Sequence, residues 1–123
     1  MPHADICSLD YAKNIKKCGW GSVRLIAELD TMELTDDQKL VCLQAVTKFG
    51  VRCQVLHVVE ELRELADALE KATKGEGNLE EIVDERADVA IMLYQLDALL
   101  LPAVAPEAAR HIQTKIDKLT GYL

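Results

Sequence analysis

Residues 51–74 read VRCQVLHVVEELRELADALEKATK, and residues 79–101 read LEEIVDERADVAIMLYQLDALLL. In the first segment, apolar side chains recur at steps of three and four residues, the spacing that lines one face of an α-helix. This apolar stripe consists of Val55, Val58, Leu62, Leu65 and Leu69. It predicts a long amphipathic helix with Leu62 at the centre of its buried face.

The second segment follows a glycine-containing turn at residues 75–77. Asn78 stands three residues before Glu81, a spacing typical of an N-terminal helix cap, so a second long helix is expected over residues 79–101. Residues 89–96 of this helix are apolar on nearly every side. Such a helix is normally surrounded by others, and one small chain can hardly cover it. The sequence therefore predicts self-association.

The rest of the chain divides at glycine and proline residues, and no internal repeat or long linker is present. Acids in the first turn, glycine after the last turn and proline at the start mark helix ends. The further helices expected from these signals cover residues 8–17, 22–29, 35–49 and 106–121.

Length and composition indicate one helical domain. The chain has 123 residues and a mass of 13.7 kDa, which suits a single hydrophobic core. Only 4% of the residues are aromatic and Ala and Leu are abundant, which favours helices over sheets. We therefore expect an all-α, antiparallel helical bundle of the four-helix type completed by oligomerisation. Residues 35–123 would form its core, and residues 1–34 would form an N-terminal extension.

The charge and the cysteines exclude several classes of protein. A net charge of −7 argues against a duplex nucleic-acid surface, which needs clustered Lys and Arg. The apolar run at residues 89–104 is interrupted by polar residues and proline, so no membrane span is expected. The four cysteines form no CxxC pair and the N-terminus lacks a signal-peptide pattern, which is typical of a cytoplasmic protein with reduced thiols.

Acidic residues concentrate between residues 60 and 88, and their spacing indicates a cation site. On the first long helix, the side chains of Gln54, His57, Glu61 and Glu64 fall along one border of the predicted apolar face, while Glu60 points further toward solvent. On the second helix, three-residue spacing places two more acids on a shared face. These acids are Glu85 and Asp88.

Four carboxylates on two antiparallel neighbours repel one another unless a cation compensates their charge. Oxygen ligands without a Cys or His cluster favour Mg²⁺ or Mn²⁺ over zinc. Because Mg²⁺ often takes further ligands from substrate phosphates, phosphorylated compounds are the expected substrate class. The alternative is a solvated acidic face of the kind common on surface helices.

The motif Gln54-x5-Glu60-Glu61-x2-Glu64, a glycine-containing turn and then Glu85-x2-Asp88 resembles the MazG-like, all-α nucleoside triphosphate pyrophosphohydrolases, over residues 48–101. The resemblance implies that Glu61, Glu64, Glu85 and Asp88 bind Mg²⁺, with Glu60 as an outer or alternative ligand. It also implies hydrolysis of a nucleoside triphosphate to the monophosphate and pyrophosphate by water attack at the α-phosphorus. Glu61 or Glu64 would take the proton of that water. Family members are dimers or tetramers, so a homodimer or homotetramer is implied here.

For other polar residues, a role in substrate binding competes with an ordinary structural role. Lys115 and Lys118, with His111 one turn earlier, could bind substrate phosphates, or they could form a solvated face. His57 could be a metal ligand or donate a hydrogen bond to a phosphate, or it could simply lie on a polar border. The amide of Gln54 could orient a carboxylate or a base edge. Trp20 could stack on a base or simply pack. Lys13, Lys16 and Lys17 invite the same phosphate-binding suggestion, against a solvated face.

The cysteines offer a further alternative, a zinc site. The pairs His3-x3-Cys7 and Cys53-x3-His57 lack the spacing of a zinc finger. Cys42 and Cys53 are instead predicted to be small core residues.

Two other functional classes compete with the hydrolase. A ferritin-like di-iron bundle needs Glu-x-x-His, and no Glu in this chain has a His three residues later. The second is a non-catalytic helical oligomer that binds a protein partner, in which the acids only keep the helices solvated. This reading predicts no dependence of stability on Mg²⁺.

Overall fold

The computed structural model describes residues 21–101, 103 and 105–123. These residues form helices and connecting turns and contain no β-strand. The helices are α2 (Gly21–Asp30), α3 (Asp36–Phe49), α4 (Val51–Thr73), α5 (Leu79–Leu100) and α6 (Ala105–Gly121). The all-α prediction is therefore confirmed for the described part of the chain, and the ends of these five helices agree with the expected ones to within a residue or two. The helix expected over residues 8–17 lies outside the described residues.

Local signals explain where the helices of the core begin and end. Thr35 caps α3 by accepting from the backbone N–H of Gln38, while the Gln38 side chain accepts from the N–H of Thr35. Asn78 caps α5 by accepting from the N–H of Glu81 at 2.8 Å. Gly50, Gly75 and Gly77 have positive φ values of 81°, 74° and 74°, which favour glycine at the turns before and after α4.

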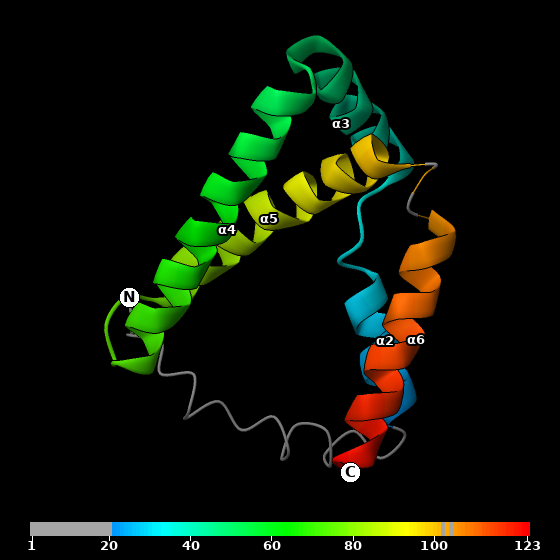
Figure 1. Cartoon of the computed structure of the whole chain (residues 1–123). Helices are drawn as coiled ribbons and strands as arrows, with labels where there is room; N and C mark the ends of the chain where they lie inside the picture. Colours follow the sequence, from blue (N-terminus) through cyan, green and yellow to red (C-terminus); the bar gives the residue numbers. More distant parts are fainter. Residues whose placement is uncertain (1–20, 102, 104) are drawn as a thin grey trace.

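The core consists of α4 packed antiparallel on α5, with α3 across both (Figure 1). The buried apolar side chains are few and mostly small: Cys42, Val58, Ala68, Ala72 and Val89. Small residues along α4 permit close approach of the two long helices, which brings polar side chains of α4 and α5 together as well. An ion pair between Lys71 and Glu81, at 3.6 Å, also joins the end of α4 to the start of α5.

Helix α6 stays outside this three-helix packing (Figure 1), and its first turns share a pocket lining with the end of α5 around Leu101. None of the α6 residues is buried, although Ile112, Ile116 and Leu119 follow one another on one of its faces. The described part of one chain thus supplies three packed helices, while α2 and the amphipathic α6 lie outside that packing.

Two expectations about buried residues are wrong. Leu62 is not the centre of the buried face, because 43% of it is exposed. The face that α4 turns to its neighbours carries Gln54, Val58 and Ala68 instead. Cys42 is buried as predicted, but Cys53 is exposed. The physical reason is shared: α3 and α5 cover only one side of α4, and the apolar residues on the other side have no covering helix in the described chain.

Candidate metal centre

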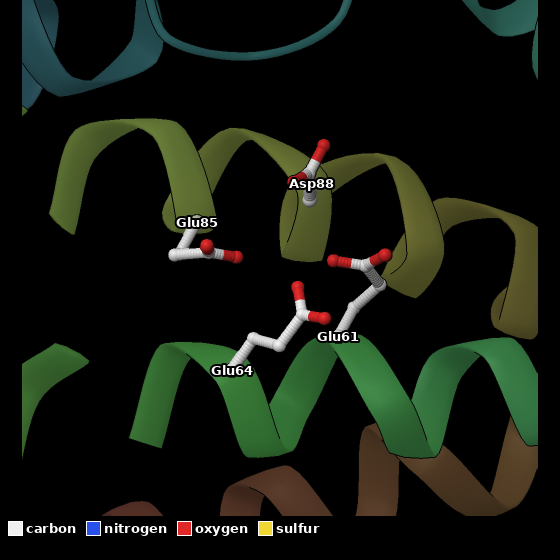
Figure 2. A group of neighbouring side chains, drawn as sticks. All are labelled: Glu61, Glu64, Glu85 and Asp88. Carbon is white, nitrogen blue, oxygen red and sulfur yellow. The ribbon is translucent and has the colours of Figure 1, made fainter. Parts of the chain in front are cut away.

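Four carboxylates converge between the two long helices, and we call this group the acid centre (Figure 2). Glu61 and Glu64 come from α4, and Glu85 and Asp88 come from α5. The three-residue spacing within each pair places both side chains on one helix face. One carboxylate oxygen from each residue lies within 4.8 Å of those from the other three. The grouping expected from the sequence is therefore present.

The acid centre contains oxygen atoms that lack a hydrogen-bond donor. The Oε2 atoms of Glu61 and Glu85 are buried and receive no hydrogen bond. In the described part of the chain, no Lys or Arg side chain forms an ion pair with any of the four acids. Buried anionic oxygens without donors are costly, and a cation is the ligand that compensates them. The donor set, four hard oxygen ligands, fits Mg²⁺ or Mn²⁺.

The same arrangement raises two pKa values. Burial raises the pKa of Glu61 above its ordinary value of 4.5, and the nearby carboxylates of Glu64 and Asp88 raise it further. Burial also raises the pKa of Glu85, followed by the effects of Glu64 and Asp88. Both shifts have the direction expected when like charges lie close together at half-buried positions.

These shifts predict how stability depends on pH without a divalent cation. Just above pH 4.5 the folded protein binds more protons at Glu61 and Glu85 than the unfolded chain, so its free energy of unfolding should fall as pH rises through the raised pKa values. Urea unfolding in EDTA between pH 4.5 and 7.5 measures this slope. The double variant Glu61→Gln, Glu85→Gln should be less sensitive to pH than the wild type. Equal slopes in both proteins would refute this origin of the pH dependence.

His57 is the predicted polar residue that lies against the acid centre. Its Nε2 is 3.5 Å from Oε1 of Glu61, and its side chain is 49% exposed. A protonated His57 favours the ionised form of Glu61, although this effect is smaller than that of burial. His57 can therefore orient one carboxylate while its ring still reaches solvent.

The other predicted site residues lie elsewhere in the described chain. Glu60 is exposed and does not join the acid centre. The sequence predicts Gln54 on a polar border of α4, and this prediction is wrong. The residue is buried against α3, where its Nε2 donates to the carbonyl oxygen of Ala45 at 3.5 Å. Lys115 and Lys118 are exposed on α6, outside the three-helix packing. The Nε2 atom of His111 lies 4.0 Å from the Oε2 atom of Glu107, which belongs to the same helix.

Some predictions fall on residues outside the described part of the chain. These residues are His3, Cys7, Lys13, Lys16, Lys17 and Trp20. For the second zinc pair, neither Cys53 nor His57 belongs to the group of potential metal ligands found among the described residues, which is the acid centre.

The sequence places Gln95 on the same face of its helix as Glu85 and Asp88 but assigns it no role; in the structure it is 3% exposed and lies at the contact between α5 and α3. Its Nε2 donates to the carbonyl oxygen of Cys42 at 3.2 Å. The seven-residue step from Asp88 gives the helix face of Gln95, but no local pattern shows that a backbone carbonyl of α3 lies opposite it.

Comparisons of the chain with protein-family models, with curated proteins and with solved structures find no match. Among the described residues, no helix combines the length and the apolar character that crossing a membrane requires.

Proposed function

We propose that this chain hydrolyses a nucleoside triphosphate to the monophosphate and pyrophosphate in a Mg²⁺-dependent reaction, as its resemblance to the MazG-like enzymes implies. The observation that carries the proposal is the acid centre, with two carboxylates from each long helix and buried oxygens on Glu61 and Glu85 that lack donors. A purely solvated acidic face would leave such oxygens open to water.

Glu61, Glu64, Glu85 and Asp88 would hold the metal, and Mn²⁺ would be an acceptable substitute for Mg²⁺. When bound, the cation supplies charge neutralisation of the phosphate oxygens and polarisation of the phosphoryl group. The carboxylates fix its position between the two helices. Because α4 and α5 are rigid elements joined by a short turn, they hold these ligands in a preorganised arrangement.

The chain also offers groups for proton transfer and for substrate contact. Glu61 and Glu64 are the candidates for the base that takes a proton from the attacking water, with His57 orienting Glu61 at 3.5 Å. Attack at the α-phosphorus would release pyrophosphate without a nucleophile from the protein. Lys115 and Lys118 remain candidates for phosphate contacts. Because α6 lies outside the three-helix packing, they would reach an acid centre from a neighbouring chain.

We also propose that the active form is a homodimer or a homotetramer. The exposed half of the α4 stripe supports this, since Val55, Leu62 and Leu69 are 39%, 43% and 37% exposed. On α6, Ile112, Ile116 and Leu119 are 62%, 47% and 55% exposed. Exposed apolar side chains that line one face of each of two helices are typical of an interface.

The oligomer proposal predicts that Leu62→Glu shifts the protein toward the monomer, because a charge would be buried in the interface. Sedimentation velocity over a concentration series measures the change. Arg63→Glu, which adds a negative charge on the outer side of the same helix, is the matched control and should leave the assembly intact. The proposal fails if the wild type is a monomer at all concentrations, or if both variants dissociate equally.

The second candidate function is a non-catalytic helical oligomer that binds a protein partner. The same exposed apolar faces favour it, because they serve an interaction surface as well as they serve an enzyme's subunit contacts. It differs from the hydrolase in its expected response to Mg²⁺, since an acidic face without a site gains no specific stability from the ion.

The experiment that tests the hydrolase is product analysis. The protein is incubated with Mg²⁺ and a panel of canonical and modified nucleoside triphosphates, and the nucleotide, pyrophosphate and orthophosphate products are separated. Monophosphate with pyrophosphate is the expected result. Orthophosphate release would mean attack at a different phosphorus, and the absence of turnover for every nucleotide would favour the interaction module.

A further inference from the structure

A pocket of about 390 Å³ lies between α3 and α5. Its apolar walls come from Leu34 and Val41 on one side and from Ile91 on the other. Ile91 follows Asp88 by three residues and so lies about 4.5 Å further along the helix axis. The pocket also contains two amide side chains, Gln38 and Gln95.

Gln95 presents an unused hydrogen-bond acceptor. The residue is 3% exposed, and its Nε2 donates to the carbonyl oxygen of Cys42 at 3.2 Å. Because a carbonyl oxygen can only accept, this contact fixes which end of the amide carries the NH₂ group. The Oε1 atom is buried and receives no hydrogen bond. An acceptor left unpaired at such a place is costly, and a ligand with an N–H group would satisfy it.

In Gln38 the oxygen of the side-chain amide, rather than the NH₂ group, is already hydrogen-bonded. Its Oε1 accepts from the backbone N–H of Thr35 at 2.8 Å as part of the cap of α3. The oxygen is therefore engaged, and the NH₂ group is the part of the side chain that remains for a ligand. The two glutamines that line this mainly apolar pocket thus leave one acceptor and one donor without a protein partner among the described residues.

We propose that this pocket binds the nucleobase of the substrate, with Gln95 accepting a hydrogen bond from a base N–H and Gln38 donating one to a base acceptor. This inference rests on the proposed function, which brings the phosphates of the same molecule to the acid centre. Nucleobases are flat, largely apolar on their faces, and carry adjacent donors and acceptors on one edge.

The position and the size of the pocket agree with this ligand. Gln95 follows Asp88 by seven residues, which corresponds to about 10.5 Å along the axis of α5. A nucleotide whose phosphates lie at the acid centre can extend its base along the same helix. The volume of 390 Å³ falls in the range of small-molecule sites, which are typically about 300–1,000 Å³.

The test measures nucleoside binding without phosphates or Mg²⁺, so that it is independent of hydrolysis. Cytidine, uridine, adenosine and guanosine are titrated into the labelled full-length protein, and binding is followed by NMR at the methyl groups of Val41 and Ile91. At least one nucleoside should produce saturable shifts at these methyls. Asp88→Asn, which alters the acid centre, should leave this binding unchanged.

Gln38→Glu is the most informative variant, because a glutamate retains the oxygen that caps Thr35 and suits the first turn of a helix. It removes the NH₂ donor while preserving the local fold, which an unchanged melting temperature would verify. Nucleoside affinity should fall by about tenfold or more, since the base acceptor would face a carboxylate. The shift in melting temperature caused by Mg²⁺ should be the same as in the wild type.

A ligand-side comparison tests Gln95 even where its variants fail to fold. Purine riboside, which lacks the 6-amino group of adenosine, should bind at least about tenfold more weakly than adenosine if adenosine binds. In Gln95→Leu, where that variant folds, this difference should disappear. The proposal is overturned if no nucleoside shifts the pocket methyls, or if Gln38→Glu binds as well as the wild type. If the protein hydrolyses triphosphates but gives one of these two overturning results, only the base pocket is refuted. If nucleosides bind in the pocket but no triphosphate is hydrolysed, only the proposed function is refuted.

Discussion

Replacing Glu61 by Gln should reduce nucleoside triphosphate hydrolysis by at least about 10²-fold, because one carboxylate ligand and one candidate base are lost together. The same change should raise the melting temperature of the protein in EDTA. Glu61 is repelled by Glu64 and Asp88, and its Oε2 is buried without a donor, so a neutral side chain relieves repulsion in the folded state.

This combination of lost activity and gained stability separates a functional site from a structural one. Glu60→Gln is the matched control, since it makes the same chemical change at the adjacent, exposed position outside the acid centre. It should retain most of the activity and alter stability little. Steady-state hydrolysis assays and thermal melts on both variants measure the two effects. Wild-type turnover in the Glu61→Gln variant would exclude the acid centre from the reaction.

The second large effect is stabilisation by Mg²⁺. An ion that binds the folded state alone stabilises it by about 2.7 kcal/mol at a free concentration 100 times its Kd. For a domain of this size, that corresponds to a rise in melting temperature of about 10 °C. The ion relieves the repulsion among Glu61, Glu64, Glu85 and Asp88, so the rise should be much smaller in the double variant Glu61→Gln, Glu85→Gln.

Ionic strength has to be controlled in this measurement, because a chain with a net charge of −7 gains some stability from screening by any salt. The melts are therefore compared with NaCl at matched ionic strength. A metal site predicts a saturable rise in melting temperature that is specific to Mg²⁺ or Mn²⁺. If NaCl produces the same shift, or if the double variant responds like the wild type, the carboxylates are a solvated acidic face and the interaction module becomes the better account.

The sequence predicts the acid centre well because its geometry depends on local rules. Three-residue spacing places Glu61 with Glu64 and Glu85 with Asp88 whatever the rest of the chain does. The short turn between α4 and α5, after which Asn78 caps α5, then makes the two helices run antiparallel and brings the two pairs of acids together. Both rules operate within a few residues and need no knowledge of the tertiary fold.

The buried face of α4 depends instead on which helices cover it. The spacing of Leu62 within the apolar stripe is correct, but only α3 and α5 pack on α4 in the described chain, and they cover the side that carries Val58 and Ala68. The same limitation explains Gln54 and Gln95. Their burial arises from contacts with the backbone carbonyls of α3, which the sequence patterns of α4 and α5 do not encode.

The most direct test of the central claim is hydrolysis in water enriched in ¹⁸O with Mg²⁺ present, followed by mass spectrometry of the separated products. Attack at the α-phosphorus, with cleavage of the bond between the α- and β-phosphates, should place one ¹⁸O atom in the nucleoside monophosphate and none in the pyrophosphate. Turnover should stop when EDTA removes the ion. Label in pyrophosphate or orthophosphate, or turnover that persists in EDTA, would contradict the account.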